Sequence, residues 1–199
     1  MNAQPGSAGI DPSGGNYVQL VPNQANQFGY QVLNNTFDVR GNFSVSGYFN
    51  PTNLSSNGSG NSGDWIGLIL LPVDPSNVAV SASYGGGGLG IAGIQNALAL
   101  GVDMYQNVSN PNYNDPSPGP FAALRWTGSS GTPQPLGATG LYTSQQNLMQ
   151  WGKALRYTLN YFYNGGDAYL TGSITDSNNA ANTFTFDTRG KLGITLPPQ

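Results

Sequence analysis

The chain of 199 residues contains no histidine and no cysteine, and its nine acidic residues are all aspartate, so glutamate is missing too. Without histidine or cysteine, a Ser-His-Asp or Cys-His nucleophile system cannot form. The usual structural zinc sites, built from cysteine and histidine, are excluded for the same reason. The paired glutamates of most glycosidases are also absent, although two aspartates could in principle replace them. The composition therefore points away from an enzyme.

Charged residues are scarce as well, at 8% of the chain against about 25% in ordinary globular proteins. Six basic residues and a net charge of −3 argue against a nucleic-acid partner, because phosphates require clustered lysine and arginine. No apolar run approaches the ~18 residues that span a bilayer, so we expect no membrane insertion. Residues 1–20 lack the apolar core and basic flank of a secretion signal. We therefore expect a domain of a larger precursor.

Apolar residues instead follow the two-residue period of β-strands. In the segment 37–49 the apolar residues share one parity and the polar residues the other, which predicts a pair of strands with one buried face. The continuous apolar run 65–73 predicts a strand buried on both faces. In 97–106, the residues Leu98, Leu100, Val102 and Met104 share one face, and Asp103 and Tyr105 lie on the other.

Turn signals divide the rest of the chain into further strands. Residues 164–167 read Asn-Gly-Gly-Asp between two strand-like segments, which predicts a hairpin because glycine supplies a positive φ. Short strands are also expected at 121–128 and 183–188. Together these elements predict an all-β fold, an antiparallel β-sandwich of the jelly-roll type. Residues 1–16 are mostly Gly, Ser, Pro and Asn, and we expect them to form a flexible leader.

Three polar features interrupt the apolar strands: Asp64, the tetraglycine Gly85–Gly88 and Asp103. Oxygen donors follow Asp103 at Tyr105 (through its carbonyl), Asn107 and Asp115, and a hard cation such as Ca²⁺ takes six to eight oxygens. The same residues also suit ordinary structural roles, with Asp103 at a strand end and the others in Asx turns. Asp64 can likewise be a plain loop residue, and the glycines a flexible loop.

Taken together, the segments DWIGLILLP, GGGGLG, ALALGVDMYQN and NDPS occur in the order of a known motif series. They resemble the motifs of the legume-type (L-type) lectins, and residues 17–30 resemble bacterial surface members of that family. The resemblance covers residues 17–196. It implies one concanavalin-like jelly-roll sandwich over residues 17–199, with no catalytic activity.

The resemblance also implies a set of site residues. Carbohydrate would be bound by Asp64, Gly87, Gly88, Tyr105 and Asn107, with the aromatic ring stacked on the sugar and the polar groups on its hydroxyls. Calcium would be held by Asp103, the Tyr105 carbonyl, Asn107 and Asp115. The transition-metal site of plant members is not expected, because Gly101 and Pro120 stand where its glutamate and histidine would be. Ca²⁺ without Mn²⁺ is therefore the expected cofactor.

Two functions remain open from the sequence. One is a calcium-dependent glycan-binding module of an adhesin, secreted or anchored to the cell wall, with host or microbial surface carbohydrate as its partner. The other is a structural β-sandwich module of a surface, stalk or coat protein without a glycan ligand. A glucanase on the same sandwich would need an E-x-D-x-x-E run, which a chain without glutamate cannot contain.

Overall fold

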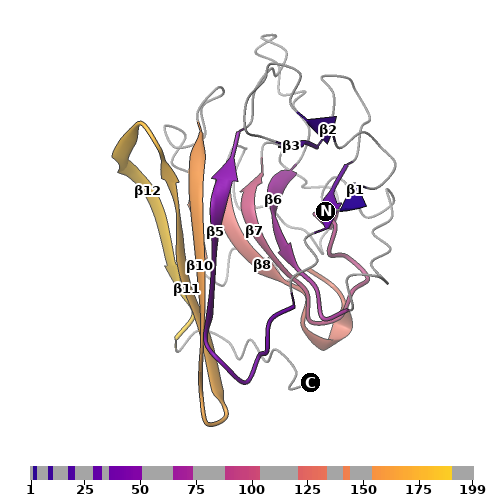
Figure 1. Ribbon diagram of the computed structural model, residues 1–199. Coiled ribbons are helices and arrows are strands. Elements are labelled where there is room, and N and C mark those ends of the chain that lie inside the picture. Colours follow the sequence, from indigo (N-terminus) through magenta and orange to yellow (C-terminus); the bar gives the residue numbers. More distant parts are fainter. Residues whose placement is uncertain are drawn as a thin grey trace.

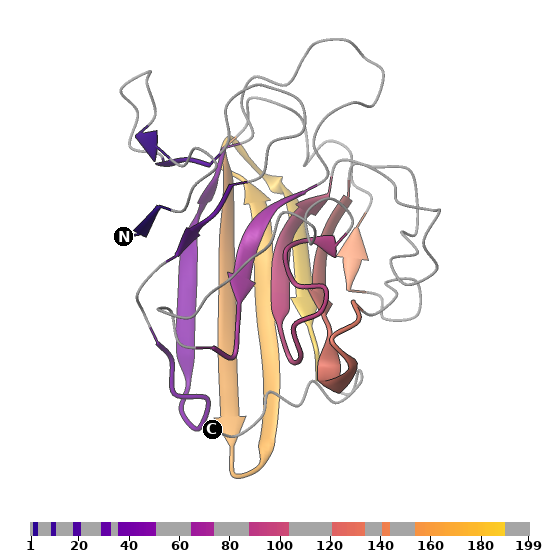
Figure 2. The ribbon, with the colours of Figure 1, turned by 90° about the vertical axis from the view of Figure 1, so that its right-hand side faces the viewer.

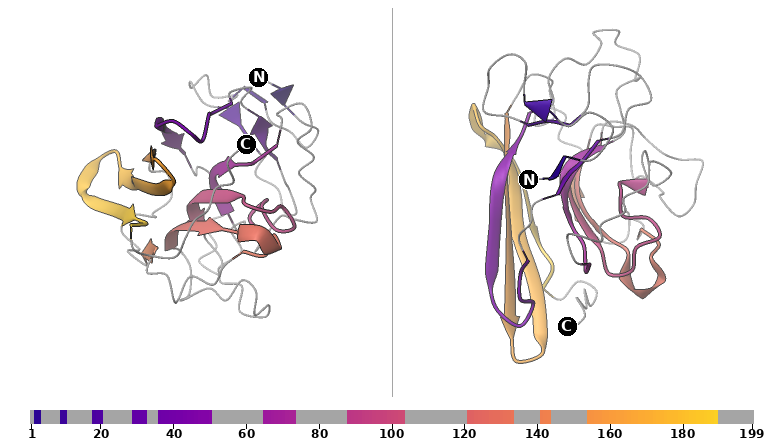
Figure 3. Two further views of the ribbon diagram at one scale, coloured as in Figure 1. Left: turned by 90° about the horizontal axis from the view of Figure 1, so that it is seen from below. Right: turned by 45° about the vertical axis from the view of Figure 1, so that its right-hand side comes forward.

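The computed structural model describes residues 2–3, 9–10, 18–20, 29–32, 36–50, 65–73, 88–103, 121–133, 141–143 and 154–189. These residues form two four-stranded antiparallel sheets that face each other as the layers of a sandwich (Figure 1; Figure 3, right). No α-helix occurs in the part of the chain that the structure describes. The predicted all-β antiparallel β-sandwich is confirmed.

The first sheet, called sheet I here, has the strand order β12-β11-β10-β5. Its strands are β5 (Phe43–Phe49), β10 (Leu155–Asn164), β11 (Asp167–Asp176) and β12 (Asn179–Asp187). Figure 2 shows the long strands running side by side. The predicted hairpin at 164–167 joins β10 to β11, and its two glycines have φ values of 59° and 127°. An L-residue rarely adopts these angles, which explains the glycine pair.

The second sheet, called sheet II here, has the order β6-β7-β8-β9. It is built from β6 (Trp65–Leu70), β7 (Leu98–Asp103), β8 (Phe121–Trp126) and β9 (Tyr142–Thr143). Two short ladders lie outside the main sheets. One pairs β1 (Asn2–Ala3) with β4 (Gln31–Val32), and the other pairs β2 (Gly9–Ile10) with β3 (Val18–Gln19). The domain boundary expected at residue 16 stays a prediction.

The segment 37–49 forms one strand rather than the predicted pair. Residues 43–49 form β5 with the expected alternation of exposed and more buried side chains, whereas 38–41 form a turn. The Gly41 amide donates to the Asp38 carbonyl at 3.1 Å, and the Asp38 carboxylate accepts from Arg40. An aspartate at the start of a turn stabilises it through such local bonds. The two-residue alternation of apolar and polar residues therefore extends into a turn, and there it does not indicate a strand.

One apolar core fills the space between the sheets. Sheet II contributes Leu98, Leu100 and Val102 of β7, and sheet I contributes residues such as Leu159 and Ile174, all at most 2% exposed. A second, smaller cluster lies on the other face of sheet II and contains Leu89, Ile91, Ala97 and Ala99. Strand β6 packs on both clusters, as its continuous apolar run predicted. Its side chains are only half-buried, and among the described residues β6 is the edge strand of sheet II.

Candidate functional site

Residues of two predicted motifs meet at one end of sheet II. Strand pairing sets Trp65, the residue after Asp64, directly opposite Asp103, and Asp103 directly opposite Phe121. Residues opposite one another in an antiparallel pair have Cα atoms about 4.5–5.5 Å apart. The strand-end residues of two predicted motifs are therefore adjacent in space, although 38 positions separate them in the chain.

Asp103 points away from the sandwich core. Its neighbours Val102, Leu100 and Leu98 belong to the core, and successive strand residues alternate between faces. The carboxyl-bearing side chain is nevertheless only 1% exposed. The sequence placed Asp103 on the face opposite these apolar residues, and this is confirmed.

The Trp65 indole lies on the same face, above two glycines. A Cβ atom built at Gly67 would lie 2.5 Å from Cζ2 of the Trp65 indole, and one built at Gly101 would lie 2.8 Å from the same atom. The two glycines pair with each other across β6 and β7. Together they leave the space in which the indole lies against the sheet.

The segment after the tetraglycine also packs on this face. Gly88 is buried, and its carbonyl accepts the amides of Ile91 and Ala92 at 3.0 and 3.1 Å. The turn continues through Leu89 and Gly90, both with positive φ. Leu89 is 2% exposed and lies in the cluster against which Trp65 packs. Parts of three predicted motifs thus share the outer face of sheet II.

A buried cation on this face has no counterpart in the sequence prediction. Arg125 of β8 is 0% exposed, and its guanidinium carbon lies 5.8 Å from the centre of the Phe121 ring. Phe121 is the residue that pairs with Asp103 in the sheet. Removing a charge from water is costly unless an opposite charge or hydrogen bonds compensate. The only sequence signal was a single arginine within the apolar strand FAALRW.

The remaining predicted site residues lie outside the described part of the chain. These are Asp64, Gly85, Gly86, Gly87, Tyr105, Asn107 and Asp115. Within the described ranges, no three histidine, cysteine or acidic residues gather as a metal-binding group. Of the four calcium ligands expected, the structure therefore describes Asp103. The donors predicted around it are carboxylate, amide and carbonyl oxygens, which suit the oxygen preference of calcium.

The pKa shifts of the described residues arise in and beside sheet I. Hydrogen bonds from the Arg40 side chain lower the pKa of Asp38 to about 2. Burial raises the pKa of Tyr157 and of Tyr161. All three shifts lead away from neutral pH, so none of these groups becomes a general acid or base near pH 7.

No helix long and apolar enough to cross a membrane is found among the residues that the structure describes. No protein-family model matches the chain.

The chain is similar to the serine-rich adhesin for platelets of Staphylococcus aureus, with 31% identity over 142 residues, which are 70% of this chain and 6% of the adhesin. The adhesin of that name in strain MRSA252 is 35% identical over 107 residues, or 54% of this chain and 8% of the adhesin. In strain MSSA476 the same identity and length cover 4% of the adhesin. The chain spans less than a tenth of the length of these relatives. It is a domain related to one part of a bacterial adhesin.

Proposed function

We propose that this chain is a non-catalytic, calcium-dependent carbohydrate-binding module of an extracellular bacterial adhesin. Asp64, the Gly85–Gly88 loop and Asn107 would hold the glycan, with Tyr105 as its aromatic contact. The similarity to a staphylococcal adhesin supports an adhesion role and a place at the cell surface. The partner would be a host or microbial surface glycan.

The pairing of Trp65 with Asp103 is the observation that carries this proposal. It places the chain neighbour of the proposed sugar-binding Asp64 beside the proposed calcium ligand Asp103. The Asp64 carboxylate could accept hydrogen bonds from sugar hydroxyls, and its negative charge would strengthen those bonds. The packing of Leu89 and Trp65 in one cluster sets the end of the glycine loop on the same face.

Calcium would be held by Asp103, the Tyr105 carbonyl, Asn107 and Asp115, and its charge would fix the loop that carries Asn107. The burial of Asp103 is compatible with this assignment, because a carboxylate that is 1% exposed needs an opposite charge or hydrogen bonds around it. A calcium ion at the end of β7 would supply such a charge.

The test is glycan-array binding by the wild-type chain in calcium and in chelator, together with Asp64→Ala and Asp103→Asn. We expect chelation and both substitutions to abolish binding. Calcium should raise the melting temperature of the wild type, because a ligand that binds only the native state stabilises it. The Asp103→Asn variant should lose this calcium response.

Asp38→Asn is the matched control, since Asp38 lies in an exposed turn beside sheet I and pairs with Arg40. It should keep both glycan binding and the calcium response. If chelation changes neither binding nor the melting temperature of the wild type, the calcium-dependent site is refuted. A folded chain that binds no glycan on the array would instead favour the structural β-sandwich module.

A further inference from the structure

The outer face of sheet I carries an ordered array of hydroxyl and amide side chains. Alternate residues of its strands enter the core, and those between them face outward. Strand pairing arranges the outward residues in two rows across the sheet. We call this set the polar face: Ser44, Asn160, Thr171 and Asp187 form one row, and Ser46, Thr158, Ser173 and Thr185 form the other.

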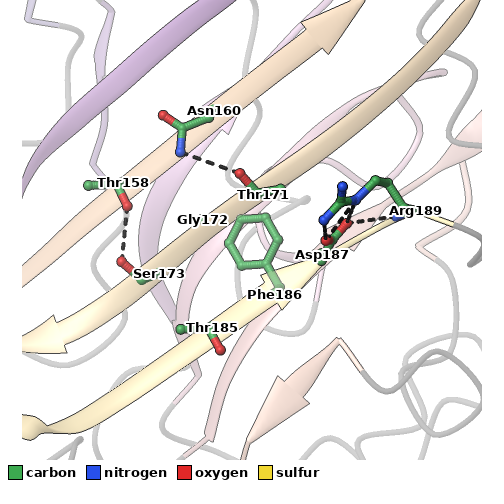
Figure 4. Close-up of a pocket in the computed structure, with 9 residues that line it drawn as sticks. All are labelled: Thr158, Asn160, Thr171, Gly172, Ser173, Thr185, Phe186, Asp187 and Arg189. Carbon is green, nitrogen blue, oxygen red and sulfur yellow. Dashed lines mark hydrogen bonds and ion pairs between the residues drawn. The ribbon is translucent and has the colours of Figure 1, made fainter.

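Hydrogen bonds hold these side chains in place. Ser44 Oγ donates to Asn160 Oδ1 at 2.8 Å, and Asn160 Nδ2 donates to Thr171 Oγ1 at 3.4 Å. In the second row, the hydroxyls of Thr158 and Ser173 are bonded at 3.0 Å (Figure 4). Bonded rows of this kind fix the rotamers before a ligand arrives, which lowers the entropy lost on binding.

An open groove of about 690 Å³ runs over this face on β10, β11 and β12 (Figure 4). At one end, the Arg189 side chain donates to the Asp187 carboxylate, and both side chains are substantially exposed. The bonded pair offers a charged donor and a charged acceptor with no net charge between them. A neutral ligand with many hydroxyl groups matches that balance, because each hydroxyl both donates and accepts.

Aromatic rings continue the array beyond the first row. Phe162 and Tyr169 are opposite each other on β10 and β11, with ring centres 4.8 Å apart and planes inclined by 18°. Both are half-buried and share the parity of Asn160 and Thr171, so they belong to the outer face. The Arg189 guanidinium carbon lies 5.2 Å from the Tyr169 ring centre. Aromatic surface beside polar side chains suits sugars, which have apolar and hydroxylated sides.

We propose that the polar face is a second carbohydrate-binding surface, which takes a neutral oligosaccharide chain across β10, β11 and β12. The inference goes beyond the proposed function, because this surface uses neither Asp64 nor the residues assigned to calcium. A second copy of this chain fits the face poorly, since the centres of protein interfaces are apolar and aromatic. Here the two central rows consist of hydroxyls, the Asn160 amide and the Asp187 carboxylate.

The test uses methyl and amide NMR shifts of the whole chain, titrated with cellohexaose, xylohexaose and maltohexaose. The titrations are made in chelator on the Asp64→Ala background, so that the calcium-dependent site makes no contribution. At least one hexasaccharide should produce saturable shifts at Thr158, Thr171 and Thr185. The variants Thr171→Val and Tyr169→Ala should each weaken binding about tenfold, through a lost hydroxyl and a lost ring.

Thr183→Val is the matched control, because Thr183 lies on β12 outside the groove and bonds to Thr175 and the Ala180 carbonyl. It should leave the affinity unchanged. The proposal is overturned if no hexasaccharide shifts the polar face, or if Thr171→Val and Tyr169→Ala bind like the wild type. It is also overturned if these signals move with protein concentration alone, since the face would then join two copies. A glycan array on which binding does not depend on calcium would refute the proposed calcium-dependent site and would leave the test of the polar face unaffected.

Discussion

At the scale of single residues, the outer face of sheet II depends on two positions without side chains. Gly67 and Gly101 lie opposite each other, and the Trp65 indole occupies the space above them. The resemblance to lectins marked Gly101 as the place of an absent metal-binding glutamate. The packing gives a steric reason for its absence, because a Cβ at Gly101 would meet the Ile66 carbonyl and the Gly67 Cα.

We therefore expect Gly101→Ala to destabilise the domain by about 1–3 kcal/mol, the usual cost of overpacking a filled site. Urea unfolding followed by tryptophan fluorescence measures this change. The control is Gly41→Ala, where the nearest atom to an added Cβ is the Asp38 carbonyl oxygen at 3.7 Å. Equal urea midpoints for the two variants would mean that the space between Gly101 and the Trp65 indole tolerates a methyl group.

Sequence reasoning reached some of these residues and missed others. The two-residue period was enough to place Asp103 opposite the apolar side of its strand, because alternation is a local property of the backbone. Arg125 escaped prediction, since one cation in an apolar strand carries no pattern, and its burial and its contact with the Phe121 ring arise only in the folded sheet. The position of the Trp65 indole likewise depends on two glycines that pair only in the folded sheet.

At the scale of elements, Thr127 links the segment 88–97 to the end of β8. Its hydroxyl donates to the Ile94 carbonyl at 2.6 Å and accepts the Ala97 amide at 3.0 Å, and its amide donates to the Ala97 carbonyl at 3.1 Å. The residue is 0% exposed; its bond to the Ala97 amide is buried and its bond to the Ile94 carbonyl is partly buried. This segment carries Leu89 and Ile91, which cover the outer face of sheet II.

Thr127→Val keeps the shape of the side chain and removes the hydroxyl. We expect a loss of about 1–3 kcal/mol, because a buried amide and carbonyl lose their partner. Hydrogen exchange at the Ala97 amide should accelerate more than exchange in sheet I. Thr188→Val is the control, since the Thr188 hydroxyl accepts the Leu170 amide at 2.8 Å in the other sheet. If both variants affect Ala97 equally, Thr127 does not hold this segment locally.

Periodicity predicted strands better than it predicted their ends. Most of the described long strands were found from alternation or apolar runs, because those patterns follow directly from a buried face. The turn at 38–41 was assigned to a strand because its apolar residue, Val39, keeps the same parity as Phe43. The turn is stabilised by hydrogen bonds from Arg40 to the Asp38 carboxylate, which the alternation of apolar residues cannot reveal.

At the scale of the whole molecule, the two sheets share one core and should unfold together. Leu159 of β10 is 1% exposed and belongs to the cluster that also contains Leu98, Leu100 and Val102 of β7. Neither sheet can leave the other without exposing these side chains to water. Burial of that shared apolar surface is the main stabilising contribution to the sandwich.

Leu159→Ala should lower the free energy of unfolding by about 2–5 kcal/mol, through lost burial and the cavity left behind. Amides of β7 in sheet II should lose protection along with those of β10. Ser46→Ala, an exposed change on β5, should stay within about 0.5 kcal/mol of the wild type. Persistent protection of β7 in the leucine variant would show that the sheets unfold separately.

The place of β5 at the edge of sheet I also has a kinetic consequence. Strands β10, β11 and β12 are consecutive in the chain, and so their hairpins close over short loops. By contrast β5 joins β10 across a long separation, with Ser44 and Asn160 116 positions apart. Closing a long loop costs entropy before any contact compensates, and distant pairings slow folding. During synthesis β5 leaves the ribosome before the other strands of sheet I, yet it waits for β10, so its unpaired edge is exposed longest to other nascent chains.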